Sequence, residues 1–278
     1  MSLSEKLLTV NADDFGYTRD VNSGIIEAHR KGILTAATLM ANGQAFDDAV
    51  RLSRANPSLD VGCHLVLVGG TSMLTGEPYP RSVPDLIRAV VMRQIKPYPE
   101  LRDQIRKIQA AGLKPLHLDT HKHSHLFPHI LEIVAKLSEE FHIPFVRRPF
   151  DFPMRPGKVP LAKRMISKSF LIVAAKFEQS LIRYNCKSTN FFAGFALTGA
   201  FTSEELVALI RELPEGSTEF MCHPGHCGEE LMASKTRLKK SRAEELAALV
   251  SPEVREALRE SNVRLVRYSE LLALATGT

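Results

Sequence analysis

Histidine is concentrated in one short segment of this chain. Four of the ten histidines, together with one aspartate, lie between residues 117 and 125. A neutral imidazole is the commonest metal ligand among protein side chains, and it also carries protons near neutral pH. One interpretation of the segment is therefore part of a divalent metal site. The other is a solvated, histidine-rich polar loop.

The histidine-rich segment is expected to begin as a β-strand. Leu116 and Leu118 alternate with polar residues, which is the pattern of a half-buried strand. Alternate residues of a strand share a face, and a loop after the strand can return further side chains to that face. The polar residues expected near one another are His117, Asp119 and His121 on the strand, with His123 and His125 on the loop.

Three further stretches place titratable side chains at or near the end of an apolar run. They are Asp13 and Asp14 after residues 7–10, His64 within residues 61–67, and His223 after residues 218–222. Two adjacent carboxylates repel each other, so a cation beside one leaves the other available as a base. The plainer interpretations are an Asp-containing turn before Gly16 and a histidine that is only packed in the core.

Short β-rich runs alternate with helical patterns about eight times along the chain. This alternation is typical of parallel βα units, in a barrel or a doubly wound sheet. Functional groups collect at the carboxyl ends of parallel strands. We therefore predict a single domain over residues 1–278, with the acidic and imidazole side chains named above at one edge of its sheet.

Residues 69–99 interrupt this rhythm. The stretch contains two adjacent glycines and five prolines, with one short apolar piece between them. Long insertions of this kind are often lids or binding loops, and we predict such a role here. A tolerated surface excursion is the alternative.

Composition narrows the class of protein. Hydrophobic residues make up 44% of the chain, charged residues 24%, and the formal net charge is +5. The four cysteines have no disulfide-framework spacing, and the first residues lack the features of a secretory signal, so we predict a cytoplasmic protein. The sequence contains no phosphate-binding loop, dinucleotide fingerprint or nucleic-acid motif, and no nucleic-acid partner is expected.

The residue types favour hydrolysis of an amide or ester. One aspartate and two histidines can form an open metal site, a second aspartate can take a proton from water, and another histidine can protonate the leaving group. A competing zinc site would use the Cys-His-Pro-Gly-His-Cys segment, with Cys222, His223, His226 and Cys227 as ligands. Six consecutive residues turning at Pro-Gly can hardly surround one ion, so we rank that site lower.

Residues 161–184 combine apolar and basic side chains. Lys163, Arg164, Lys168, Lys176 and Arg183 are spread through a background rich in Leu, Ile, Val and Phe. We favour a buried helix with basic rims. The alternative is a helix that lies against a membrane, since basic residues beside an apolar surface suit anionic lipid.

Four motifs together carry a resemblance to a known family. They are Asn-Ala-Asp-Asp-Phe-Gly at 11–16, Gly-Cys-His-Leu at 62–65, His-Leu-Asp-Thr-His-Lys-His-Ser-His at 117–125 and Cys-His-Pro-Gly at 222–225. The chain resembles the YdjC-like carbohydrate deacetylases over most of its length, about residues 7–271. The resemblance implies a distorted parallel (β/α) barrel of seven to eight strands, related to the polysaccharide deacetylases. It also implies removal of the acetyl group from an N-acetylated amino sugar.

The resemblance also implies roles for particular residues. Asp14, His64 and His121 match the metal ligands, Asp13 the general base, and His223 the residue that assists the leaving amine. Family members are associated with magnesium, whereas the softness of an Asp-His-His set also suits zinc or a similar ion. Residues that would support the ligands or face the substrate are His117, Asp119, His123, His125 and Arg147.

Two departures from the family pattern bear on the substrate. Thr120 stands where a serine is usual, and Lys122 stands where the middle of three consecutive histidines is usual. This form is closer to the hopanoid-associated branch, so the resemblance leaves a soluble oligosaccharide and a lipid-linked sugar both open. Other readings are a non-catalytic sugar- or metal-binding barrel and a metallo-phosphoesterase with two metals. A homodimer would be unsurprising.

Overall fold

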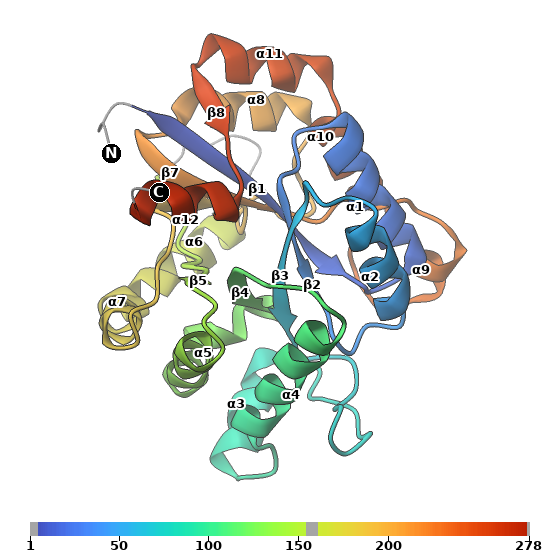
Figure 1. The fold of residues 1–278 in the computed structure, drawn as a ribbon, viewed down its shortest axis with the longest axis vertical. Coiled ribbons are helices and arrows are strands. Elements are labelled where there is room, and N and C mark those ends of the chain that lie inside the picture. The colour runs from blue at the N-terminus through green and yellow to red at the C-terminus, as the bar shows by residue number, and fades with distance from the viewer. Residues whose placement is uncertain (1–4, 154–160, 277–278) are drawn as a thin grey trace.

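The protein is described here by a computed structural model that places residues 5–153 and 161–276. Figure 1 shows strands running through the middle of the molecule and helices surrounding them. Within the described residues no helix is both long and apolar enough to cross a membrane.

One parallel sheet forms the centre of the fold. Its strands are β1 (Lys6–Phe15), β2 (Ala36–Leu39), β3 (Asp60–Leu65), β4 (His117–Thr120), β5 (Phe145–Val146), β6 (Phe191–Ala193), β7 (Gly216–Cys222) and β8 (Val263–Leu265). The order is β5-β4-β3-β2-β1-β7-β6, and β8 pairs with the beginning of β1. The strands are largely apolar and buried, as expected when helices cover a parallel sheet.

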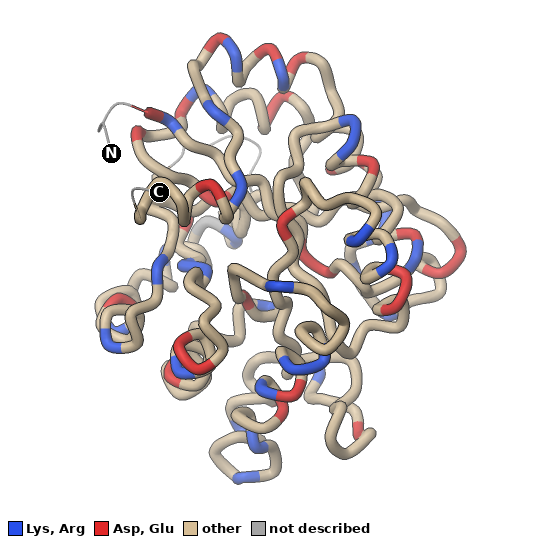
Figure 2. Tube along the Cα trace, in the orientation of Figure 1, with Lys and Arg blue, Asp and Glu red and all other residues tan. Residues whose placement is uncertain are grey.

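The helices follow the strands in the alternating order that the sequence predicts. They are α1 (Arg19–Lys31), α2 (Phe46–Arg54), α3 (Val83–Val91), α4 (Pro97–Ala110), α5 (Pro128–Glu140), α6 (Leu161–Ser169), α7 (Ala174–Arg183), α8 (Ser203–Glu212), α9 (Glu229–Ala233), α10 (Lys240–Leu249), α11 (Pro252–Glu260) and α12 (Tyr268–Thr276). Two 3₁₀ segments, η1 (His121–Leu126) and η2 (Phe170–Val173), complete the set. Basic and acidic residues alternate along outer helices such as α11 (Figure 2).

The sheet curls into an open barrel. All its strand pairs are parallel, and its two edge strands are β5 and β6. These edges do not form a ladder with each other. Two isolated bridges connect them instead: Phe145 of β5 pairs with Lys187 before β6, and Asp151 after β5 pairs with Phe192 of β6. The prediction of a distorted parallel barrel is therefore confirmed, with only isolated bridges between β5 and β6.

Local sequence explains where the elements near the site begin and end. Thr18 caps α1 by accepting a hydrogen bond from the Val21 amide, and Gly32 follows its last residue. Strand β6 is short and ends at Ala193. Gly194 has a φ of +129°, and the carboxylate of Asp151 then accepts the next two amides, those of Phe195 and Ala196.

The prediction of a buried helix over residues 161–184 is wrong. The segment forms α6, η2 and α7, and only part of it faces the core. Phe177 and Leu181 are buried, whereas Ile172 is 86% exposed and Ile182 is 72% exposed. The apolar background that suggested burial is divided between an inner and an outer face.

Residues 69–99 form a compact excursion beside the sheet. A single antiparallel bridge joins Thr71 to Pro78, and α3 follows. The Glu100 carboxylate at the start of α4 is buried and accepts hydrogen bonds from Ser72 and Tyr79, which fastens the excursion to the helix. A lid role for this region remains a prediction.

Candidate metal and catalytic site

A bulge at the end of β1 brings two neighbouring carboxylates to the same side. In a regular strand, successive side chains point to opposite faces. Here the pairing of β1 with β2 shifts between Ala12 and Phe15, and Asp14 has a φ of +67°. Asp14 therefore turns towards the neighbourhood that Asp13 already faces. A non-glycine residue in this region of backbone space is strained, and such strain collects at functional sites.

The adjacent strands β3 and β4 supply two imidazoles. His64 is paired in register with Asp119, and its Nδ1 lies 2.6 Å from an Asp119 carboxylate oxygen. That contact directs the Nε2 of His64 the other way. His121 is the first residue after β4, and its Nδ1 lies 3.2 Å from His64 Nε2.

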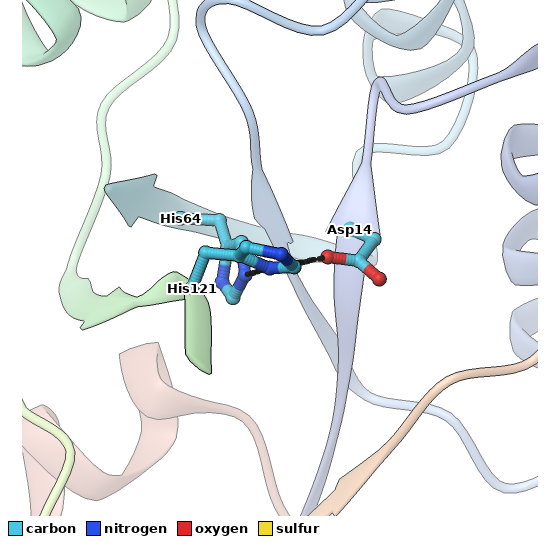
Figure 3. A group of neighbouring side chains, drawn as sticks. All are labelled: Asp14, His64 and His121. Carbon is cyan, nitrogen blue, oxygen red and sulfur yellow. Dashed lines mark hydrogen bonds and ion pairs between the residues drawn. The ribbon is translucent and has the colours of Figure 1, made fainter. Parts of the chain in front are cut away.

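Three donor atoms thus meet at one point (Figure 3). Asp14 Oδ1 lies 3.4 Å from His64 Nε2 and 3.2 Å from His121 Nδ1. Tetrahedral ligands at bond lengths of 2.0–2.1 Å stand about 3.3 Å apart, so these three spacings match one face of such a site. The Asp14 Oδ1 atom is also buried without a hydrogen-bond donor. The three residues therefore fit a divalent metal ion.

The contact between His64 and Asp119 is typical of a metal-binding histidine. A carboxylate that accepts the proton on one ring nitrogen leaves the other nitrogen free to coordinate. Without a metal, burial lowers the pKa of His64, but Asp119 and Asp13 favour its charged form and raise the pKa to about 10. His121 has the most exposed side chain of the three, at 26%, so the site opens to solvent on its side.

Arg147 organises the carboxylates around the site. Its buried guanidinium donates two hydrogen bonds to Asp13, at 2.7 and 2.8 Å, and also contacts Asp119 and Glu219 at 2.7 Å. Burial raises the pKa of Asp13, yet Arg147 and the nearby histidines outweigh it and hold that pKa well below its ordinary value. Asp13 is therefore an ionised carboxylate held in a fixed orientation.

Sequence reasoning missed Arg242. This residue lies on α10 with a side chain only 1% exposed, and its guanidinium donates to Asp14 Oδ2 at 2.5 Å. That contact occupies one carboxylate oxygen and leaves the other for a metal. The only sequence signal is an arginine in a helix with little amphipathic character, where most basic residues would face solvent.

His223 is the first residue after β7 and lies near Asp13. Its Nε2 lies 3.9 Å from Asp13 Oδ2, and its backbone amide donates to Glu245 at 2.5 Å. Burial lowers the pKa of His223 to about 4, although Asp13 and Asp14 act in the opposite direction. Glu245 is a second residue that sequence reasoning missed. Its carboxylate accepts both the His223 amide and the Gly199 amide, and so it connects the loop after β7 to the loop after β6.

The other histidines of the cluster lie apart from the three donors. His117 contacts Asn11 at 2.9 Å and stacks on Tyr268, deeper in the sheet. His125 contacts the Thr120 hydroxyl and the Arg147 carbonyl, so it does not pair with His121. The ring of His123 lies 5.6 Å from that of Phe195. Lys122 and His123 have positive φ angles, and this reversal turns the loop away from the donors.

The competing zinc site does not form. Cys222 is buried and contacts the Asn11 carbonyl, whereas Cys227 is exposed. His226 pairs with Glu27 on the surface at 3.1 Å. Among the described residues, the Cys-His-Pro-Gly-His-Cys segment contributes only His223 to the site.

Asp13, His64 and Asp119 make a second group with metal-ligand spacing, but a cation already lies among them. Their atoms lie within 4.8 Å of one another. However, Arg147 bonds to both carboxylates, and His64 meets Asp119 through the nitrogen that faces away from His121. The guanidinium takes the place of a second ion, which disfavours a two-metal site.

A comparison with models of protein families shows which family this chain matches. A family model described as YdjC-like protein matches residues 7–260. The chain belongs to the YdjC-like family. All four motifs that suggested this family fall inside the matched region.

Two relatives of this YdjC-like chain are named carbohydrate deacetylase. A protein named carbohydrate deacetylase from Brevibacillus brevis is 35% identical over 95% of this chain and 99% of its own length. Another of that name, from Geobacillus stearothermophilus, is 34% identical over 95% of this chain and 98% of its own length.

Solved structures support the fold. A protein named for cellobiose-phosphate cleavage, from Enterococcus faecalis V583, aligns with a TM-score of 0.75 at 24% identity, over 96% of this chain and 99% of that one. A mutant of a CE4-family pseudoenzyme from Bacillus anthracis aligns with a TM-score of 0.50 at 13% identity, over 97% of this chain and 68% of that one.

Proposed function

We propose that this YdjC-like protein is a metal-dependent hydrolase that removes the acetyl group from an N-acetylated amino sugar. The observation that carries the proposal is the meeting of Asp14 Oδ1, His64 Nε2 and His121 Nδ1 beside a second carboxylate, Asp13. The names of the relatives, which match over nearly the whole chain, support the same reaction class.

In this proposal Asp14, His64 and His121 hold the ion. A divalent ion bound there polarises the amide carbonyl and lowers the pKa of water, which is the chemistry that amide hydrolysis needs. Asp119 keeps the proton of His64 on Nδ1, and Arg242 orients Asp14 through its other oxygen. Magnesium is expected from the family resemblance, while the two imidazole ligands also suit zinc.

Asp13 and His223 move the proton. Asp13 takes a proton from the water that attacks the acetyl carbon, and that proton is passed to the amide nitrogen as its bond to the carbonyl carbon breaks. His223 is proposed to deliver it, because its Nε2 lies 3.9 Å from Asp13 Oδ2. The products are acetate and the free amine.

Asp13→Asn is the sharpest test of this assignment. Arg147 keeps two carboxylate partners, Asp119 and Glu219, so the variant is expected to fold. Acetate release from N-acetylglucosamine oligosaccharides, with Mg²⁺ or Zn²⁺ added to chelator-treated protein, should fall by about 10³-fold or more, while metal affinity stays within a few-fold. Activity near that of the wild type would remove Asp13 from the mechanism.

The same assay separates the two remaining readings. A non-catalytic sugar- or metal-binding barrel would bind metal without releasing acetate from either a soluble oligosaccharide or a lipid-linked amino sugar. A metallo-phosphoesterase would bind about two ions per chain and hydrolyse a phosphate ester instead. Our proposal predicts one ion per chain and acetate release that chelation abolishes.

A further inference from the structure

Large exposed apolar side chains gather on one part of the surface. Of the eleven such side chains in the described chain, six lie between residues 161 and 182. Five of them, which we call the α6–η2 surface, are Leu161, Met165, Ile166, Leu171 and Ile172, with exposed fractions from 48% to 86%. Single exposed apolar residues are ordinary, but a cluster of this kind marks an interaction surface.

The charge around the α6–η2 surface is of one sign. Residues 161–176 contain four basic residues and no acidic one, in contrast to the mixed charges of α11. Lys168 and Lys176 are exposed. The first acidic side chain beyond them, Glu178, is paired with Arg148. The surface therefore offers apolar and positively charged groups together.

The opposite side of the segment is firmly attached to the barrel. Phe177 is buried against Phe150, and the hydroxyl of Ser167 donates to Asp151 at 2.8 Å. The Phe170 ring lies 4.6 Å from Phe195. The exposed side chains therefore lie on a segment that is packed against the barrel.

The α6–η2 surface also borders the proposed catalytic site. Its contacts are with the segments that follow β5 and β6, at the strand ends where the metal ligands gather. Phe195, which contacts Phe170, also contacts His123, two residues from His121. Two ring contacts therefore connect the inner side of this segment to the loop that follows His121.

We propose that the α6–η2 surface docks on an anionic lipid bilayer. Exposed Leu, Ile and Met side chains insert at the boundary between headgroups and acyl chains, and adjacent lysines contact acidic headgroups. A second copy of the chain fits less well, because two such faces would bring like charges together. The inference concerns binding alone and holds whether or not the protein is a deacetylase.

Vesicle sedimentation with the full chain tests the proposal. We expect binding to vesicles with about 30% phosphatidylglycerol, and little binding to phosphatidylcholine alone or at about 0.5 M salt. Lys168→Glu with Lys176→Glu should weaken binding about 25-fold. Leu171→Ser with Ile172→Ser should weaken it about tenfold or more.

Matched controls change the same residue types elsewhere. Val91→Ser with Met92→Ser removes two exposed apolar side chains at the end of α3, and Arg88→Glu with Lys114→Glu makes the same change in net charge. Both should bind like the wild type. Equal losses in the controls, or no binding to anionic vesicles, would overturn the proposal. The lipid proposal would also be overturned if the wild type were a dimer and Leu171→Ser with Ile172→Ser converted it to a monomer. That result would favour a second copy of the chain as the occupant of the surface.

Discussion

Arg242 shows how a single buried cation can orient a carboxylate of the proposed metal site through the oxygen that faces away from the other two ligands. Its guanidinium holds Asp14 Oδ2, while Asp14 Oδ1 remains without a donor and faces His64 and His121. Burial raises the pKa of Asp14, but Arg242 and the two histidines keep it well below the ordinary value. The carboxylate is therefore ionised and oriented, with Oδ2 bonded to Arg242 and Oδ1 available to a metal ion.

Replacing Arg242 should weaken metal binding. Arg242→Met keeps the length of the side chain but frees the Asp14 carboxylate to rotate, and loss of such a supporting contact costs about 10- to 100-fold in affinity. Competition with a chelator of known affinity measures the effect. The metal affinity of Arg242→Lys, which keeps a positive charge, should lie between those of the wild type and Arg242→Met. An unchanged affinity in Arg242→Met would show that Asp14 is positioned by the bulge alone.

At the residue scale, sequence reasoning found the donors and only some of their partners, because Asp119 and Arg147 were named but Arg242 was not. Asp14, His64 and His121 could be expected together because each lies near the carboxyl end of a strand, and parallel strands bring those ends to one edge. Arg147 was named as a supporting residue, but its bonds to three acids could not be foreseen. Those acids lie 134, 28 and 72 residues away along the chain, and no periodic pattern links them.

At the scale of elements, the bulge in β1 and the reversal after β4 decide which side chains meet. A one-residue irregularity moves Asp14 to the side of Asp13. Lys122 and His123 have left-handed backbone conformations. The loop then brings the ring of His123 beside Phe195 and the ring of His125 beside Phe177 of α7. The alternating pattern predicted the strands themselves. It could not predict these two departures, because lysine gives no signal for the left-handed region and aspartate adopts it only occasionally.

A close contact between α1 and the loop after β7 places His223. A Cβ atom on Gly24 would lie 2.4 Å from the Cα of Gly225, so only glycine allows this approach. Gly24→Ala should push the loop and His223 away from Asp13. We expect a loss of about 1–3 kcal/mol in the free energy of unfolding, despite the better helix propensity of alanine, and a fall in acetate release.

Urea unfolding and the acetate assay measure the two effects of Gly24→Ala. Ser23→Ala is the matched control, because Ser23 lies on the exposed face of the same helix turn. It should leave both stability and activity near those of the wild type. If Gly24→Ala lost stability but kept full activity, the contact would support the fold without positioning His223.

At the scale of the whole molecule, the curled sheet encloses a buried group of charged side chains. Asp13, Asp119 and Glu219 are all buried around Arg147. The alternation of β-rich runs with helical patterns predicted a parallel sheet, and the family resemblance implied its distorted barrel form. The two strands at the ends of the sheet, β5 and β6, could not be predicted, because strand patterns along the chain do not show which strands pair.

Glu245 connects three separate parts of this molecule and should make its stability depend on pH. The carboxylate sits on α10 and accepts amides from the loop after β6 and from His223 after β7. Burial raises its pKa to about 7 from 4.5, although those amides, Arg242 and Lys163 act in the opposite direction. Between pH 4.5 and 7 the folded protein therefore holds a proton that the unfolded chain has released.

The free energy of unfolding should consequently fall as pH rises through this window. For a shift of this size the fall is about 3 kcal/mol, and it is complete once the pH exceeds the folded pKa. The side chain of Glu245→Gln cannot titrate. The free energy of unfolding of this variant should therefore not show this fall with pH, even if the amide changes its value by a constant amount. Urea unfolding of both metal-free proteins at several pH values from 4.5 to 8 measures the difference in slope. Parallel curves would mean that Glu245 is ionised in the folded protein throughout the range, and that the two amides and Arg242 offset its burial.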